Sequence, residues 1–217
     1  MVYERKSVNV ERILRIGVLG AKKVGKTCLI TRLLKRGYPD KYSPTIETLF
    51  RYDIQTSENK FTKLEILDTA GNFEFPDMLR KAVRSCHAFV LMFDLSDAKR
   101  TFREVETLRQ LILDERSGES VPIIVIGNKS DLIIKEDNVE NKVLDAIVSI
   151  DWDCTYLTTS AKCDTNISDV YKAVCKELDI KSLQDIDVVQ RIKDATQKID
   201  KIKRISLLKR GFSVKSF

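Results

Sequence analysis

The stretch 20–27 has the residue types of a phosphate-binding loop. It reads Gly-Ala-Lys-Lys-Val-Gly-Lys-Thr and fits the pattern G-x-x-x-x-G-K-[ST] at every fixed position. Its glycines let the backbone approach a phosphate closely, so that successive N–H groups point at it. Lys26 is expected to reach the β- and γ-phosphates of a nucleotide, and the Thr27 hydroxyl to ligate Mg²⁺. The expected nucleotide contacts of this loop are Gly20, Ala21, Lys22, Lys23, Val24, Gly25, Lys26, Thr27 and Cys28.

Two further stretches supply groups for a metal ion and a γ-phosphate. Residues 68–71 read Asp-Thr-Ala-Gly and follow an apolar run that ends at Leu67. A carboxylate there can hold the Mg²⁺ shell, and the Gly71 N–H can approach a γ-phosphate. Upstream, Tyr38 is expected to stack on the edge of a base, and Thr45 to coordinate Mg²⁺ and the γ-phosphate. The expected metal ligands are therefore Thr27, Thr45 and Asp68.

The stretch 127–131, Gly-Asn-Lys-Ser-Asp, carries groups that distinguish guanine from adenine. Asp131 can accept hydrogen bonds from guanine N1 and N2, whereas adenine would leave the carboxylate unpaired. Asn128 is expected to bridge the base and the phosphate loop, and the stem of Lys129 to cover the ring. After the last expected strand, the Ala161 N–H can donate to guanine O6. The loop that contains it consists of Ser160, Ala161 and Lys162.

Taken singly, these motifs have simpler interpretations. The first could be a glycine-rich turn, Asp-Thr-Ala-Gly another turn, and Asn-Lys-x-Asp a polar loop that caps a helix. Here they occur in order, and the strand-end motifs each follow an apolar run. Because ligands bind at the carboxyl ends of parallel strands, the set predicts a guanine-nucleotide site. The guanine contacts of Asp131 and Ala161 disfavour a P-loop kinase or an ATPase.

Apolar runs that alternate with amphipathic segments predict the elements that position these groups. The expected strands are residues 13–19, 50–54, 61–67, 88–93, 121–126 and 154–157, and the expected helices are 26–36, 77–85, 102–112, 139–147 and 166–179. Such alternation is typical of an α/β fold. We expect a six-stranded, mostly parallel sheet with one antiparallel hairpin strand and with helices on both faces.

The distribution of charge divides the chain. The 217 residues have a net charge of +6, and residues 181–217 account for all of it with ten Lys or Arg against four Asp. This asymmetry predicts a boundary near residue 180. Together with the first expected strand at residue 13 and the nucleotide motifs, it gives an expected N-terminal extension over 1–12, a GTP-binding domain over 13–180 and a basic tail over 181–217. The five scattered cysteines lack C-x-x-C spacing, and a single histidine, His87, cannot form a two-histidine metal site. Free thiols in a reducing compartment are expected.

Over about residues 13–180 the chain resembles a small GTPase of the Ras family. The resemblance rests on the stretches 20–27, 42–47, 68–71, 128–131 and 160–162. Residues 72–78 are similar to the second switch of the Dexras/Rhes and Di-Ras branches, and Lys23 and residues 109–114 lean towards Dexras/Rhes. The resemblance implies a switch between GTP and GDP with Mg²⁺. It also implies exchange factors, GTPase activators, and effectors that bind the stretch from Tyr42 to Glu47.

Three positions depart from the family pattern. Asn72 stands at the usual water-orienting glutamine, and its side chain is one methylene shorter. Lys22 and Lys23 replace two glycines, and a lysine at 22 should crowd the entry of an activator's arginine finger, although it could instead supply positive charge in cis. The implied catalytic set is Lys26, Thr45, Gly71 and Asn72. We expect slow hydrolysis; ordinary turnover and a GTP-loaded adaptor with negligible hydrolysis stay open as alternatives.

The tail has features that suit an anionic membrane surface. Apolar residues recur at the spacing of an amphipathic helix, at Val188, Ile192, Ala195, Ile199 and Ile202, and residues 201–217 are basic. Membrane binding through 188–217 is expected; a helix docked on the core and a solvated basic tail are the alternatives. No cysteine follows Cys175, so a lipid anchor is not expected. We expect a cytoplasmic monomer that reaches the inner face of the plasma membrane through this tail, and nucleic-acid binding is disfavoured.

Overall fold

The structure is a computed structural model, and it describes residues 9–34, 45, 47–57, 60–71, 76–117, 119–133 and 139–180. These residues form a six-stranded sheet in the order β2-β3-β1-β4-β5-β6. The strands are β1 (Asn9–Gly20), β2 (Glu47–Ser57), β3 (Lys60–Thr69), β4 (Ala88–Asp94), β5 (Ile123–Asn128) and β6 (Thr155–Thr158). β2 and β3 pair in antiparallel fashion, and the other neighbours are parallel. The expected fold class, with its single antiparallel hairpin strand, is confirmed.

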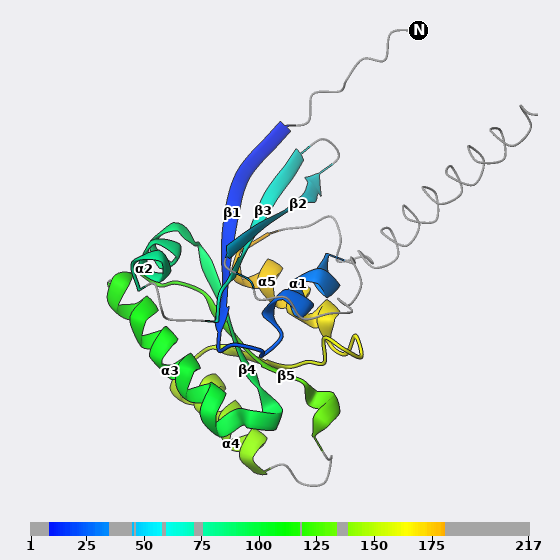
Figure 1. Cartoon of the computed structure of the whole chain (residues 1–217). Helices are drawn as coiled ribbons and strands as arrows, with labels where there is room; N and C mark the ends of the chain where they lie inside the picture. The colour runs from blue at the N-terminus through cyan, green and yellow to red at the C-terminus, as the bar shows by residue number, and fades with distance from the viewer. Residues whose placement is uncertain are drawn as a thin grey trace, which may run out of the picture. The chain divides into compact units, whose positions relative to one another are not determined.

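Helices cover both faces of this sheet (Figure 1). They are α1 (Lys26–Leu33), α2 (Pro76–Ser85), α3 (Ala98–Glu115), α4 (Val139–Ala146) and α5 (Ile167–Glu177). Three shorter helical segments are η1 (Leu95–Asp97), η2 (Ser130–Leu132) and the π-helical turn η3 (Ile147–Asp151). α1 and α5 pack on one face of the sheet, and α2, α3 and α4 pack on the other. The carboxyl ends of the strands, with the loops that follow them, remain available for a ligand.

The central strands divide their side chains between two apolar layers. In β4, alternate residues join the layer of α1 and α5 or the layer of α3; the two sets are Ala88, Val90 and Met92, and Phe89, Leu91 and Phe93. Every residue of this strand is buried. A parallel strand that is covered on both faces therefore appears in the sequence as a continuous apolar run, which is the pattern that predicts β4 and β5.

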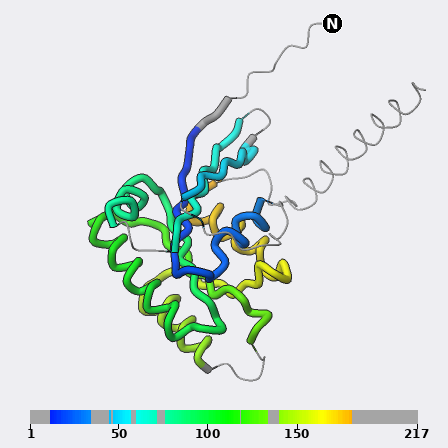
Figure 2. The backbone as a smooth tube through the Cα atoms, viewed as in Figure 1, coloured from blue at the N-terminus to red at the C-terminus, as the bar shows by residue number. Residues whose placement is uncertain are grey.

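β1 is longer than its apolar pattern predicts. It begins at Asn9 rather than at residue 13, and its first residues pair with β3 from Asn9 opposite Lys60 onward. Arg12 and Ile13 are exposed, and the Arg12 guanidinium donates to the carbonyls of Leu178 and Asp179 at 3.2 and 2.8 Å. Backbone pairing and these hydrogen bonds hold this part of the strand, so hydrophobic periodicity gives no signal for it. β1 thus begins within the stretch 1–12 that is expected as an N-terminal extension. Figure 2 follows β1 (blue) beside the hairpin of β2 and β3 (cyan).

Several expected functional residues lie outside the described residues. They are Tyr38, the effector residues 42–44 and 46, Asn72, and the tail 181–217. Their roles stay predictions, as does the domain boundary at residue 180. All five cysteines are free, as expected. Among the helices of the described ranges, none has the length and apolar character to cross a membrane.

Candidate functional site

The loop after β1 comes very close to the ends of β4 and β5. Gly20 and Gly25 have φ angles of 142° and 101°, which side chains rarely adopt. A Cβ at Gly20 would overlap the carbonyl of Met92, and one at Gly25 would overlap the side-chain amide of Asn128. Both glycines are therefore required by close contacts as well as by backbone conformation. Lys23 has a φ of 65°, so it occupies a left-handed conformation that favours glycine.

Lys26 begins α1 and is folded back over this loop. Its ammonium donates hydrogen bonds to the carbonyls of Gly20 and Ala21, at 2.8 and 2.9 Å. The residue is only 7% exposed. Burial lowers the pKa of Lys26 to about 8, while the carboxylates of Asp68 and Glu104 act in the opposite direction. The charge is thus held in a partly dehydrated place, where its attraction for an anion is stronger than in water.

The three expected metal ligands lie together. The Thr27 hydroxyl donates to Oδ2 of Asp68 at 2.6 Å, and it lies 3.0 Å from the Thr45 hydroxyl. Asp68 is fully buried, and its second oxygen, Oδ1, has no hydrogen-bond partner among the described residues. Burial raises the pKa of Asp68, opposed by the hydrogen bond from Thr27 and the charge of Lys26. The sequence places these residues far apart. The parallel pairing of β1 and β3 brings Asp68 to the loop before Thr27, and the antiparallel pairing of β2 and β3 places Glu47, two residues after Thr45, opposite Thr69.

These oxygen atoms fit a hard divalent cation. A buried carboxylate oxygen without a partner is costly, and a Mg²⁺ ion nearby would compensate it. Two hydroxyls and one carboxylate are the donor types that Mg²⁺ accepts, together with phosphate oxygens. Over the ranges that the structure describes, no cluster of three or more His, Cys, Asp or Glu could hold a metal. The donor set therefore favours magnesium over zinc.

The loop after β3 touches the phosphate loop directly. A Cβ at Gly71 would overlap the backbone of Ala21 and Lys22, so only glycine fits this approach. The preceding segment is anchored by the Thr69 hydroxyl, which donates to the carbonyl of Val18 at 2.9 Å. Lys22 is exposed on the phosphate loop. Its backbone therefore lies beside the expected γ-phosphate contact.

Asn128 links the loops at the other end of the site. Its side-chain N–H donates to the carbonyl of Val24 at 2.8 Å, so it is tied to the phosphate loop as expected. Its Oδ1 accepts from the Thr159 hydroxyl and from the Ala161 N–H, both at 3.1 Å. The Ala161 N–H, which is expected to meet guanine O6, therefore has a protein acceptor in this structure. To bind guanine O6, the Ala161 N–H would have to share its proton between O6 and Asn128 or break the hydrogen bond to Asn128.

The expected base-reading carboxylate is oriented by a buried serine. The Ser160 hydroxyl donates to Oδ1 of Asp131 at 2.5 Å and accepts from the Cys163 N–H at 3.0 Å. Ser160 is fully buried, whereas Asp131 is exposed. The backbone of Ser130 also donates to the carbonyl of Thr159, at 3.0 Å. These bonds hold the loop after β5 against the loop after β6, so the carboxylate has a fixed direction before any ligand binds.

Two residues of this site escape the sequence motifs. Arg32 of α1 donates to the carbonyls of Ala161 and Lys162, at 2.8 and 2.9 Å, and so links α1 to the loop after β6. Asp94, at the end of β4, contacts the Lys129 ammonium. The strand-end rule could have found Asp94, because it follows an apolar run. Arg32 has no such signal, since its partners are backbone atoms far along the chain.

The structure brings together most of the expected site. These residues lie around the phosphate loop or are connected to it through the loops after β5 and β6. They are residues 20–28, Thr45, Asp68, Gly71, Asn128, Lys129, Asp131, Ser160, Ala161 and Lys162. Tyr38 and Asn72 lie outside the described residues, so the base-stacking and water-orienting roles stay predictions.

Comparison with known proteins agrees with this arrangement. Residues 15–180 match the model of the Ras family. The chain is 34% identical to the mouse GTP-binding protein Rhes over 165 residues, which cover 72% of this chain and 61% of Rhes. It is also 34% identical to human GTP-binding protein Di-Ras1 over 159 residues, 73% of this chain and 78% of Di-Ras1. The match to human Rhes is 34% over 173 residues, 76% of this chain and 64% of that protein.

The chain belongs to the Ras family. The expected resemblance to the Rhes and Di-Ras branches is confirmed by these relatives. The chain spans less than two thirds of the length of the Rhes proteins that it matches.

Proposed function

We propose that this chain is a guanine-nucleotide switch that binds GTP and GDP with Mg²⁺ and hydrolyses GTP slowly. The observation that carries the proposal is the buried carboxylate of Asp68, which binds the Thr27 hydroxyl beside Thr45 and keeps one oxygen without a described partner. A buried carboxylate with an unpaired oxygen is stabilised when a cation is bound beside it. Membership of the Ras family and the names of the GTP-binding relatives support the same function.

The phosphate end of the site offers hydrogen-bond donors to a nucleotide. An ammonium has three N–H donors, and the carbonyls of Gly20 and Ala21 occupy two of those of Lys26. The third is left for a β- or γ-phosphate oxygen. The backbone N–H groups of the loop would contact the remaining phosphate oxygens, and the Gly71 N–H would contact the γ-phosphate. Bound Mg²⁺ would neutralise phosphate charge, and Thr27, Thr45 and Asp68 are the residues that would hold it.

The base end of the site would select guanine. Asp131 would accept from N1 and N2, and the Ser160 hydroxyl would keep its carboxylate in the required orientation. Adenine offers no such pair of donors, so it would leave the carboxylate of Asp131 without a partner on the base. The stem of Lys129 would cover the ring. The Ala161 N–H would donate to O6 in competition with Asn128.

A competition experiment tests the binding proposal. The full chain is titrated with fluorescent GDP in Mg²⁺ buffer, and unlabelled GDP, GTP and ATP are used as competitors. GDP and GTP should displace the probe, whereas ATP should be weaker by a factor on the order of 10⁴. A chain that binds no GDP, or that binds ATP equally well, would contradict the proposal.

The environment of Lys22 supports the proposal of slow activator-stimulated hydrolysis. The backbone of this residue touches Gly71, so its long side chain starts beside the expected γ-phosphate. We expect it to crowd an activator's arginine finger, a group that contributes about 10³–10⁵ in rate. Lys22→Gly should therefore raise activator-stimulated, single-turnover hydrolysis at least about tenfold. Lys23→Gly, one residue further from the contact, is the control and should have less effect.

The second candidate function is a GTP-loaded adaptor without useful catalysis. The close contact between Gly71 and the backbone of Lys22 favours it, because the same crowding could exclude an activator completely. Phosphate release during a single turnover separates the two functions. Wild-type hydrolysis at the ordinary rate of the family, accelerated by a Ras activator, would contradict both slow hydrolysis and the adaptor.

Partners and location are further parts of the proposal. Effectors would bind the stretch from Tyr42 to Glu47, where the structure describes Thr45 and Glu47. Exchange factors and activators would act on the nucleotide site. The tail 188–217, outside the described residues, would bind an anionic membrane from the cytoplasmic side, and the chain would act as a monomer. These proposals are supported by family membership and by the basic composition of the tail.

A further inference from the structure

We propose that Asp94 is a positioning residue for the guanine base, because it holds the side chain of Lys129 across the nucleotide site. The inference rests on the proposed function, in which the stem of Lys129 covers the guanine ring. Asp94 ends β4, and the pairing of β4 with β5 places it opposite Asn128. Lys129 is the next residue, so an anion and a cation meet at the carboxyl ends of two adjacent strands.

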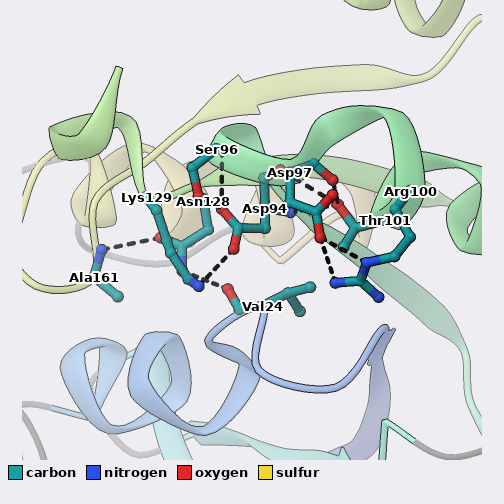
Figure 3. A network of polar contacts seen from close by, with 9 residues as sticks. All are labelled: Val24, Asp94, Ser96, Asp97, Arg100, Thr101, Asn128, Lys129 and Ala161. Atoms are coloured by element: carbon teal, nitrogen blue, oxygen red, sulfur yellow. Dashed lines mark hydrogen bonds and ion pairs between the residues drawn. The ribbon is translucent and has the colours of Figure 1, made fainter. Parts of the chain in front are cut away.

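The contact between the two charges is short and partly shielded. The Lys129 ammonium lies 2.5 Å from Oδ2 of Asp94, and the exposed fractions of the two side chains are 31% and 10%. Figure 3 shows the Lys129 side chain reaching from the end of β5 towards Asp94, next to the Asn128 amide that contacts Val24. Ion pairs that are shielded from solvent are screened less than fully exposed pairs.

Asp94 is itself fixed by the segment that follows it. Its Oδ1 accepts from the N–H and the hydroxyl of Ser96, at 3.0 and 2.6 Å. Its own N–H donates to the Thr101 hydroxyl at 3.0 Å, and that hydroxyl donates to the carbonyl of Asp97 at 2.7 Å. Both carboxylate oxygens and the backbone are therefore engaged (Figure 3). Lys129 is tied to a rigid point of the fold rather than to a mobile surface carboxylate.

The charge of Asp94 is stable at neutral pH. Burial raises the pKa of this carboxyl, but the hydrogen bonds from Lys129 and Ser96 outweigh burial and hold the pKa below its usual range. The ion pair is therefore present under the conditions in which the protein would bind a nucleotide.

Lys129 is also held at its backbone. Its φ and ψ angles are 67° and 37°, a left-handed conformation that residues other than glycine rarely adopt. Such a conformation persists where the surroundings fix it. Here Asn128 is bound to Val24 on one side of it, and Ser130 is bound to Thr159 on the other. A lysine that is already ordered loses less side-chain entropy when it covers a base.

Dissociation of fluorescent GDP from the full chain tests the positioning role. Asp94→Asn should release GDP about tenfold faster than wild type, the change expected when one charge-assisted hydrogen bond is lost. Lys129→Met should release it at least as fast. In the double variant, Asp94→Asn should add little, because its partner is already absent. Asp97→Asn is the matched control: its carboxylate pairs with exposed Arg100, and the rate should stay at the wild-type value.

A second readout separates positioning from general damage. Inosine diphosphate lacks the exocyclic amine that Asp131 would read, so the ratio of its dissociation rate to that of GDP reports the Asp131 contact. Asp94→Asn should leave this ratio unchanged, whereas a distorted loop would reduce it. Ser96→Ala, which keeps the carboxylate but loses one of its donors, should give a smaller increase in rate and replaces Asp94→Asn if that variant does not fold.

The inference is wrong if wild type retains GDP and Asp94→Asn releases it at the wild-type rate. It is equally wrong if Asp94→Asn has the same effect with and without Lys129, or if it changes the ratio of the two nucleotides. Failure of wild type to bind GDP would contradict the proposed function itself.

Discussion

Asp68 and Lys26 are charged groups from which water is largely excluded, with exposed fractions of 0% and 7%. Burial is the largest cause of both pKa shifts, upward for Asp68 and downward to about 8 for Lys26. Each shift reflects a charge that lacks part of its compensation. A phosphate bound with Mg²⁺ would supply the missing partners of both residues at once. The two shifts therefore have a functional explanation at the scale of the residue.

Removing the charge of Asp68 should separate nucleotide binding from magnesium. Asp68→Asn keeps an oxygen acceptor for the Thr27 hydroxyl but removes the charge that would attract the cation. We expect the affinity for Mg²⁺ to fall at least about ten- to a hundredfold, which is the loss when only a supporting partner of a metal ligand is removed. The release of GDP should then respond little to Mg²⁺ or to a chelator, whereas wild type should release GDP faster when Mg²⁺ is removed. The measurement is the GDP dissociation rate across a Mg²⁺ titration.

Stability gives an independent readout of the same variant. Asp68→Asn removes a buried charge with an unpaired oxygen, so the thermal unfolding midpoint without nucleotide should stay equal or rise. Asp97→Asn, outside the metal set, should retain the response to Mg²⁺. Normal Mg²⁺ dependence in Asp68→Asn would show that this carboxylate does not hold the ion.

Among the structural elements, Glu65 of β3 ties together three strands. The sheet register places it opposite Arg15 of β1 and Arg51 of β2. Its oxygens contact these guanidinium groups at 2.7 and 3.1 Å, and its side chain is 8% exposed. The hydrogen bonds from Arg15 and then Arg51 hold the pKa of Glu65 below its ordinary value of 4.5, although burial opposes them. This cluster fixes the hairpin against β1, and β3 in turn carries Asp68.

Neutralising Glu65 should therefore destabilise the domain in a pH-dependent way. Glu65→Gln is expected to cost about 1 kcal/mol, because both arginines are partly exposed and screened. The folded-state pKa is the lower one, so the stabilisation is present above the unfolded value of 4.5 and is lost as pH falls through the folded-state pKa. Denaturant unfolding at several pH values measures the difference between variant and wild type, which should shrink in acid.

Asp53→Asn is the control for this prediction. Asp53 is an exposed carboxylate of β2, two residues after Arg51, and its replacement should change stability little. A difference between Glu65→Gln and wild type that stays constant down to the acid range would contradict the role given to the ion pairs.

The sequence predicts those elements best whose residues are buried on both faces. β4 and β5 are continuous apolar runs, and the polar motifs after β1, β3, β5 and β6 lie at the strand ends where the fold class requires them. The start of β1 is not predicted, because backbone pairing and hydrogen bonds of the Arg12 side chain hold it rather than a buried apolar pattern. The contacts of Arg32 and Asp94 are not predicted for a different reason. Hydrophobic periodicity indicates which face of an element a residue occupies, but it does not identify a partner far along the chain.

At the scale of the whole molecule, the charge of +6 resides in residues 181–217. We expect this tail, outside the described residues, to bring the full chain to anionic vesicles at about 1 kcal/mol per basic residue near the surface. Reversing Lys201, Lys203 and Arg204 to Glu should lower vesicle affinity by about a hundredfold or more. Cosedimentation with phosphatidylserine-containing vesicles, compared with neutral phosphatidylcholine vesicles, measures the change.

The matched control reverses three basic residues that are exposed on the described domain, Lys99, Arg103 and Lys172. This variant should keep most of the vesicle binding. Equal losses in the two variants would indicate that net charge alone, rather than the tail, governs association. Binding of wild type to neutral vesicles would contradict the electrostatic part of the proposal.

The central claim is that the site holds a guanine nucleotide, and the most direct test is to identify what the purified chain carries. The protein is purified gently in Mg²⁺, denatured, and its released nucleotide is separated by ion exchange and quantified. We predict GDP or GTP at close to one molecule per chain, with GTP in excess if hydrolysis is as slow as proposed. An adenine nucleotide at that ratio, or no nucleotide together with no uptake of added GDP, would contradict the claim.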